Sequence, residues 1–198
     1  MDAMSYFDII RYPREHMAKA LKKVDMGEAV KSFALAGAVW GLLAGLVFAF
    51  LGTFFGALVG SESAGLGAVL AGLGMLSLIV LPIAAAVMAV LGGAIGYGVI
   101  WFGSNLLGGK GTFEQLFYLG SRLVWPLLIA GVVVNILTLI PILGWLIQLA
   151  WGVYTVYLLT TLVSVASKLS MLKSFAAIIL PWVVLVVAIA FLVALVIR

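Results

Sequence analysis

Long apolar runs that carry no charge constrain this chain more than any other feature. The longest extends from residue 64 to residue 107 and contains no Asp, Glu, Lys or Arg. Over the whole chain 66% of the residues are hydrophobic and only 9% are charged, whereas a soluble domain has roughly 25% charged residues because its surface meets water. The sequence therefore predicts an all-α, polytopic integral membrane protein whose surface mostly faces lipid.

Five membrane spans are expected. A bilayer core requires about 20 helical residues, and a tight turn at Pro141 to Gly144 separates the third span from the fourth. Region 64–107 is long enough for two interpretations: one span preceded by an interfacial or re-entrant piece, or two spans divided near Pro82. The five expected spans lie at residues 33–59, 76–107, 123–140, 145–166 and 175–197.

The positions of lysine and arginine favour five spans over six. Basic residues are enriched on the cytoplasmic side of membrane proteins. With five spans and a cytoplasmic N-terminus, every Lys and Arg except the terminal Arg198 lies on the inner side. A sixth span would move Lys110, Arg122, Lys168 and Lys173 outside. We therefore expect a plasma-membrane protein with its N-terminus in the cytoplasm and its C-terminus outside.

Residues 1–32 are expected to form a cytoplasmic N-terminal segment, and residues 33–198 the five-span domain. Residues 1–12 are of mixed character and are expected to be irregular. After Pro13, apolar residues recur at helical spacing while the basic residues fall on other faces, which predicts an amphipathic helix at the membrane interface. The apolar residues of that helix are Met17, Leu21 and Val24.

Two helix starts are marked by capping boxes, in which a side chain accepts a hydrogen bond from a backbone N–H three residues later. Asp25 with Glu28 predicts the start of the first long helix, and Thr112 with Gln115 predicts the start of another before the third span. Arg122, close to the start of that span, is expected to extend to the inner membrane surface.

Glycines spaced by four residues are the strongest internal pattern. Small residues at this spacing let two helix backbones approach closely in a membrane. The pattern predicts helix packing within the chain, or a face for a homo-oligomer or another membrane protein. The glycines concerned are Gly37, Gly41, Gly45, Gly52, Gly56 and Gly60 in the first span and Gly92 and Gly96 in the second.

Polar residues inside the expected spans are few. The candidates for an intramembrane polar site are Asn135, Gln148, Tyr154 and Thr161. Such side chains form hydrogen bonds between helices in many membrane proteins. They also allow a second interpretation, a pathway for a small solute.

The sequence offers no catalytic constellation. It has no cysteine and one histidine, His16, which is expected on the interfacial helix. No ionisable residue lies well inside an expected span, whereas ion-coupled transporters usually keep one there. We expect no enzyme activity, no metal or other cofactor and no nucleic-acid partner, and the sequence identifies no soluble substrate.

Several short motifs resemble the YIP family, the Ypt/Rab-interacting membrane proteins, and in particular its prokaryotic members. The resemblance is carried by residues 107–113 and 118–121, by the lead-in at residues 25–33, and by single positions along the chain. Those positions are Gly109, Gly120, Pro126, Trp151, Tyr157 and Pro181. The resemblance implies a cytoplasmic N-terminus, a non-enzymatic role and action through membrane lipids or protein partners. Because the long N-terminal region of the eukaryotic members is missing, Rab-type binding is not expected.

Two functional hypotheses follow. The first is a membrane-organising or partner-binding scaffold that packs through its glycine faces. The second is a small channel or transporter that uses a polar pathway near Asn135 and the fourth span.

Overall fold

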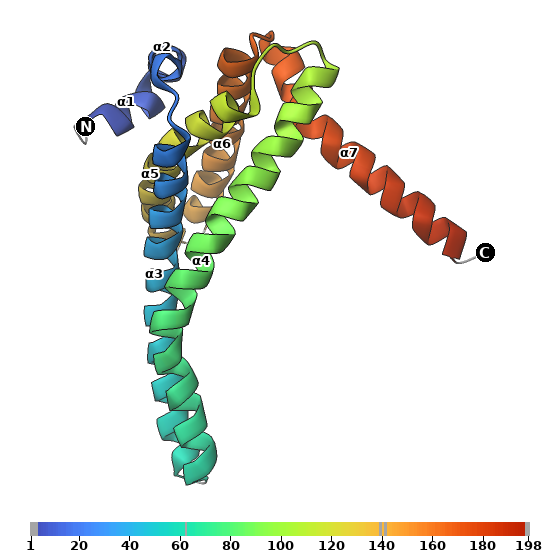
Figure 1. Cartoon of the computed structure of the whole chain (residues 1–198). Coiled ribbons are helices and arrows are strands. Elements are labelled where there is room, and N and C mark those ends of the chain that lie inside the picture. The colour runs from blue at the N-terminus through green and yellow to red at the C-terminus, as the bar shows by residue number, and fades with distance from the viewer. Residues whose placement is uncertain (1–3, 62, 139, 141, 197–198) are drawn as a thin grey trace. The chain divides into compact units, whose positions relative to one another are not determined.

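The computed structural model describes residues 4–61, 63–138, 140 and 142–196, and every regular element in these ranges is helical (Figure 1). The elements are α1 (Met4–Arg11), α2 (Pro13–Ala20), the 3-10 turn η1 (Leu21–Lys23), α3 (Met26–Gly60), α4 (Ala64–Leu106), α5 (Phe113–Leu137), α6 (Leu143–Ser167) and α7 (Met171–Val196).

Four of these helices, α3 to α6, are each long and apolar enough to cross a membrane. Their mean hydropathies are 2.3, 2.6, 1.7 and 1.6 in chain order. The following helix, α7, is also apolar over Met171–Val184. The prediction of an all-α membrane protein is confirmed.

Region 64–107 forms one helix. α4 continues through Pro82, although proline removes one backbone hydrogen bond of a helix. Because a continuous helix does not reverse its direction, the alternative of two spans divided near Pro82 is wrong. The part before residue 76 is likewise not a separate piece, since α4 begins at Ala64.

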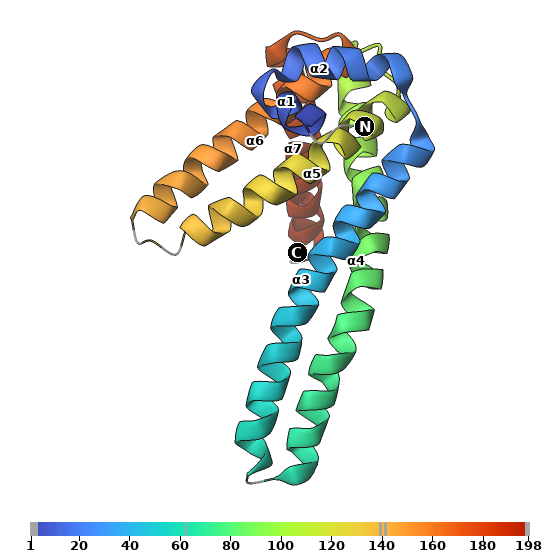
Figure 2. The ribbon, with the colours of Figure 1, turned by 90° about the vertical axis from the view of Figure 1, so that its left-hand side faces the viewer.

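The chain divides into two units, one made of Met1–Ala29 with Ala94–Arg198 and the other of Val30–Gly93. We call them the bundle unit and the hairpin unit. In the hairpin unit, α3 and the first part of α4 run side by side (Figures 1 and 2). The Ser77 hydroxyl donates to the carbonyl oxygen of Gly45 across this pair at 2.9 Å. Phe33 packs against Gly93, where an added Cβ would lie 3.2 Å from the ring.

The core of the bundle unit is assembled from five helices. α5 and α6 pack along each other (Figure 2), and α1, α2 and α7 contact this pair. One buried apolar cluster contains residues of all five: Ile9, Met17, Leu116, Leu119, Leu123, Leu158, Leu162, Val163, Ala166 and Ala177. The N-terminal segment is therefore part of the packed protein.

The structure corrects one expectation for the N-terminal segment and adds to another. Residues 4–11 form helix α1 instead of an irregular segment, because Ile9 is buried in the core of the bundle unit. In α2, Met17 is only 1% exposed and belongs to the same core, with Leu21 packed against it. The helix expected after Pro13 is therefore present, and its apolar side packs against protein.

The predicted helix starts are confirmed. The carboxylate of Asp25 accepts from the backbone N–H of Glu28 at 3.0 Å, where α3 begins. Thr112 and Gln115 form a complete capping box at the start of α5. The turn expected at Pro141 to Gly144 falls partly outside the described residues, which omit Pro141, and α6 begins at Leu143.

Candidate functional site

The bundle unit contains a buried charge. The side chain of Arg122, on α5, is only 6% exposed, and its guanidinium forms an ion pair with the carboxylate of Glu28 on α3 at 2.7 Å. The same guanidinium donates to the hydroxyl of Tyr118 and lies 4.8 Å from the centre of that ring. The sequence analysis expected this side chain to extend to the inner membrane surface; in the structure it is buried in protein and bound to Glu28. It joins the start of α3 to α5.

Local structure positions both partners of this ion pair. The cap at Asp25 begins α3 and fixes the backbone of Glu28. Tyr118 lies four residues before Arg122, on the same face of α5, and is buried. Removing a buried arginine from water is costly unless its hydrogen bonds are satisfied. The carboxylate and the phenol together supply acceptors for it.

An open pocket of about 500 Å³ lies beside this ion pair. It is lined from α1, α2, η1, α3 and α5, and most of its lining side chains are polar or charged. They are Ile9, His16, Lys19, Ala20, Lys23, Asp25, Glu28, Tyr118 and Arg122. His16, expected on a free interfacial surface, is thus part of a pocket wall.

One basic group of the pocket has a partner outside it. The ammonium of Lys19 donates to the Glu15 carboxylate at 2.6 Å, one helical turn earlier. This hydrogen bond, together with the attraction between the two charges, lowers the pKa of Glu15. Both side chains are exposed, so the pair contributes little to stability.

The turn between α4 and α5 packs against the end of α6. Gly108 has a φ of +85°, a conformation that glycine adopts without strain. The backbone N–H of Lys110 donates to the carbonyl oxygen of Ser167 at 2.9 Å. A Cβ at Gly109 would lie 3.0 Å from the Cβ of Ser167, and one at Gly111 only 2.9 Å from its Cα. These glycines let two turns of the bundle unit approach closely.

Gly120 lies under the ring of Tyr97, which packs edge-on against Phe117. A Cβ at Gly120 would overlap the Tyr97 ring. The position therefore joins the end of α4 to α5 within the bundle unit.

Replacing Gly120 with alanine should lower the free energy of unfolding by about 1 kcal/mol, since the tyrosine ring must move away from an added methyl group. Thermal unfolding of the protein in detergent would measure the change. Gly131→Ala is the matched control on the same helix, because no atom lies within 4 Å of its added Cβ. Equal stability of the two variants would contradict this packing role.

The other positions of the family motifs differ in their surroundings. Pro126 is buried within α5. On α6, Trp151 packs near Tyr154, and Tyr157, 44% exposed, follows in the same row of rings. Pro181 on α7 lies near Gly103 of α4. These positions therefore do not form one site.

The glycines at four-residue spacing fall into two groups. In the hairpin unit, a Cβ at Gly37, Gly41, Gly45, Gly52 or Gly56 would lie within 3 Å of the α4 backbone. The contact at Gly60 is looser, since an added Cβ there would lie 3.9 Å from the Cα of Gly67. Around Gly92 and Gly96 no described atom lies within 4 Å of an added Cβ. The first group therefore lies at the contact between α3 and α4, and the second lies open.

The four residues of the candidate polar site are not brought together. The Asn135 amide donates to the carbonyl oxygen of Gly131, and the Thr161 hydroxyl donates to that of Tyr157, each within its own helix. The Tyr154 hydroxyl donates to the carbonyl oxygen of Ile10 on α1 at 2.5 Å.

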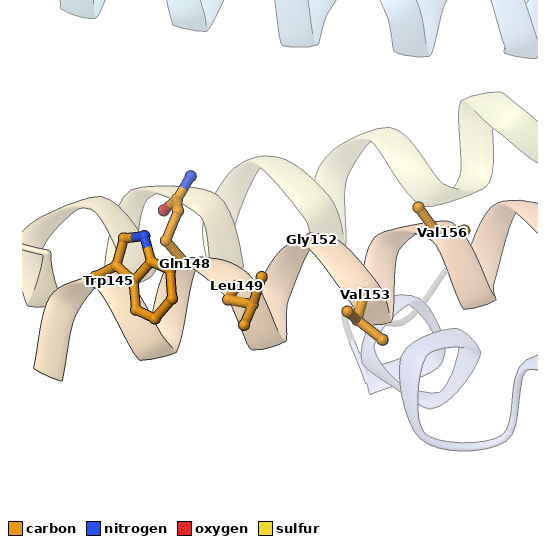
Figure 3. A pocket seen from close by; sticks show the side chains of 6 residues that line it. All are labelled: Trp145, Gln148, Leu149, Gly152, Val153 and Val156. Atoms are coloured by element: carbon orange, nitrogen blue, oxygen red, sulfur yellow. The ribbon is translucent and has the colours of Figure 1, made fainter.

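Gln148, the fourth, lies on an open groove formed by α6 alone (Figure 3). Its neighbours along the groove include Trp145 and Val153, so the groove is mostly apolar. Among the described residues, these polar groups therefore donate to separate backbone carbonyl oxygens or face outward, and they do not line a common path.

Sequence reasoning missed the pairing of Glu28 with Arg122. The two residues lie 94 positions apart. The sequence shows that each is a charge at the edge of an apolar run and that the two charges have opposite sign, but it does not show that they pair. Within the described residues, no group of three or more His, Asp or Glu side chains could hold a metal ion.

The four helices that are long and apolar enough to cross a membrane define an integral membrane protein. Residues 7–192 match the Yip1 domain. Since the match covers nearly the whole chain, the protein belongs to the YIP family, and the resemblance found in its motifs is confirmed. No curated protein and no solved structure matches the chain.

Proposed function

We propose that this protein is a non-enzymatic scaffold that organises the membrane or binds a membrane partner. In this proposal α3 to α7 provide five spans in the plasma membrane, with the N-terminus in the cytoplasm and the C-terminus outside. Residues 1–32 form the cytoplasmic segment and 33–198 the membrane domain. The distribution of lysine and arginine supports this orientation.

The observation that carries the proposal is the uncovered surface of α4. This helix has the highest mean hydropathy of the four long helices, and none of the residues in its most apolar stretch is buried against the rest of the chain. With 43 residues, it is about 65 Å long at 1.5 Å per residue. That is about twice the thickness of the hydrocarbon core of a bilayer. Lipid or another membrane protein must cover it.

Gly92 and Gly96 favour a protein partner on part of this surface. They lie one helical turn apart, both are exposed, and the side chains of Met88 and Ile95 beside them are also exposed. A second helix approaches closely at such a pair because no Cβ keeps the backbones apart. In this proposal the partner is a second copy of the chain or another membrane protein.

Cross-linking in native membranes tests the scaffold. Because the chain has no cysteine, a Gly92→Cys variant carries a single reactive thiol. We expect a bifunctional thiol reagent, or mild oxidation, to convert most of this variant into a dimer or into an adduct with a partner. Electrophoresis and mass spectrometry would identify the product.

Gly152→Cys is the matched control. Gly152 is an exposed glycine on α6 with no atom within 4 Å of an added Cβ, and no glycine lies four residues before or after it. It should cross-link much less. If both variants remain monomeric, or both cross-link equally, α4 has no specific partner and the proposal fails.

A further inference from the structure

The pocket beside Arg122 contains more charged groups than the ion pair uses. Both of its carboxylates are engaged within the chain, Glu28 with Arg122 and Asp25 with the N-terminus of α3. Of its basic groups, Arg122 binds Glu28 and Lys19 binds Glu15. The side chains of Lys23 and His16 form no hydrogen bond or ion pair with any residue that the structure describes, although Glu15 lies near enough to His16 to interact with its charge.

The basic groups that remain determine which sign of charge a ligand of this pocket should carry. An ammonium and an imidazole are both hydrogen-bond donors, and the ammonium is positively charged. Since the acidic groups already have partners, the pocket suits a ligand that brings hydrogen-bond acceptors and negative charge. It has little to offer a cation. A phosphate group suits it, because its oxygens accept several hydrogen bonds at once and interact well with basic side chains.

The position of the pocket favours a phosphate carried by a lipid. Beyond Arg122, α5 soon presents exposed apolar side chains, of which Ile129 and Val133 are the first large ones. The charged lining therefore lies at the end of an apolar helix, where the topology proposed above puts the lipid headgroups. Basic residues at this level interact favourably with anionic lipids.

We propose that this pocket binds a phosphate group, supplied by the headgroup of an anionic phospholipid, with Lys23 and His16 as its donors. Arg122 and Tyr118 form the buried floor that holds the pocket open, and the phosphate occupies the mouth. The proposal is independent of whether α4 docks a partner, since the pocket lies on other elements and is already formed in a single chain.

Lipid binding to the full chain in detergent, measured by native mass spectrometry with phosphatidylglycerol, tests the proposal. Lys23→Gln should weaken binding about fivefold, the equivalent of ~1 kcal/mol, because it removes a charge-assisted hydrogen bond to the phosphate. Lys22→Gln is the matched control, because Lys22 is its exposed neighbour on η1 but does not line the pocket. It should weaken binding less than about twofold, as a screened surface charge does.

Two further measurements complete the test. Lys23→Arg should restore the affinity, and the unfolding temperatures of all variants should equal that of the wild type, since both lysines are exposed. Inorganic phosphate in excess separates the two sources of the ligand. If it leaves phosphatidylglycerol bound, the site selects the lipid; if it displaces the lipid, free phosphate is the ligand. Equal losses for Lys22→Gln and Lys23→Gln, or no loss for either, would overturn the phosphate site.

Discussion

Replacing Arg122 with alanine should lower the free energy of unfolding by about 3 kcal/mol, the lower end of the range for removing one partner of a buried ion pair. The lower end applies because the Glu28 side chain is 41% exposed, so water can solvate the carboxylate left behind. Part of the loss comes from Tyr118, whose buried hydroxyl loses its bond to the guanidinium. Thermal unfolding in detergent, followed by near-UV circular dichroism, would measure the change.

Two further variants make this result specific to the ion pair. Arg14→Ala removes an exposed arginine of α2 and should change the stability by less than about 0.5 kcal/mol. Glu28→Gln should cost less than Arg122→Ala, because Tyr118 still accepts from the arginine. In the double variant the losses should be less than additive, since both changes break the same interaction. Fully additive losses would show that the two side chains do not stabilise each other.

The features that depend on neighbouring residues could be predicted from the sequence. The caps at Asp25 and Thr112 need only residues three positions apart, and both are present. The long helices follow from apolar length alone, because a chain in lipid must satisfy its backbone hydrogen bonds internally. The continuity of α4 through Pro82 could not be decided in this way. Both alternatives satisfied the same local pattern.

The features that depend on distant contacts could not be predicted. An arginine at the edge of an apolar run, such as Arg122, can either extend its side chain to the membrane surface or bind a partner inside the protein. The sequence does not show that Glu28 is within reach. Met17 presents the same ambiguity, since an apolar face on a short helix covers either lipid or protein. α1 forms because Ile9 is buried in the bundle unit, a contact without a local signal.

Replacing Gly41 with leucine should lower the free energy of unfolding by about 3 kcal/mol, the upper part of the usual range for overpacking. Gly41 is buried, and an added Cβ would overlap the carbonyl group of Leu81 and the Cα of Pro82. These are backbone atoms of α4, so no side-chain rotation can relieve the overlap and the two helices must separate. The separation also lengthens the bond from Ser77 to Gly45, one turn further along the pair. Unfolding in mixed micelles with increasing denaturing detergent, followed by tryptophan fluorescence, would measure the loss.

The variant Gly72→Leu separates the effect of helix–helix contact on stability from the effect of helix propensity. Gly72 lies in the same hairpin unit, is exposed, and has no atom within 4 Å of an added Cβ. Leucine favours a helix over glycine by just under ~1 kcal/mol, so this variant should be as stable as the wild type or slightly more stable. The same gain in helix propensity applies at Gly41, but there the destabilisation from overlap with the α4 backbone is larger. Opposite signs at the two positions therefore identify close backbone contact as the role of Gly41. If both variants were neutral or stabilising, α3 and α4 would not need glycine to pack against each other.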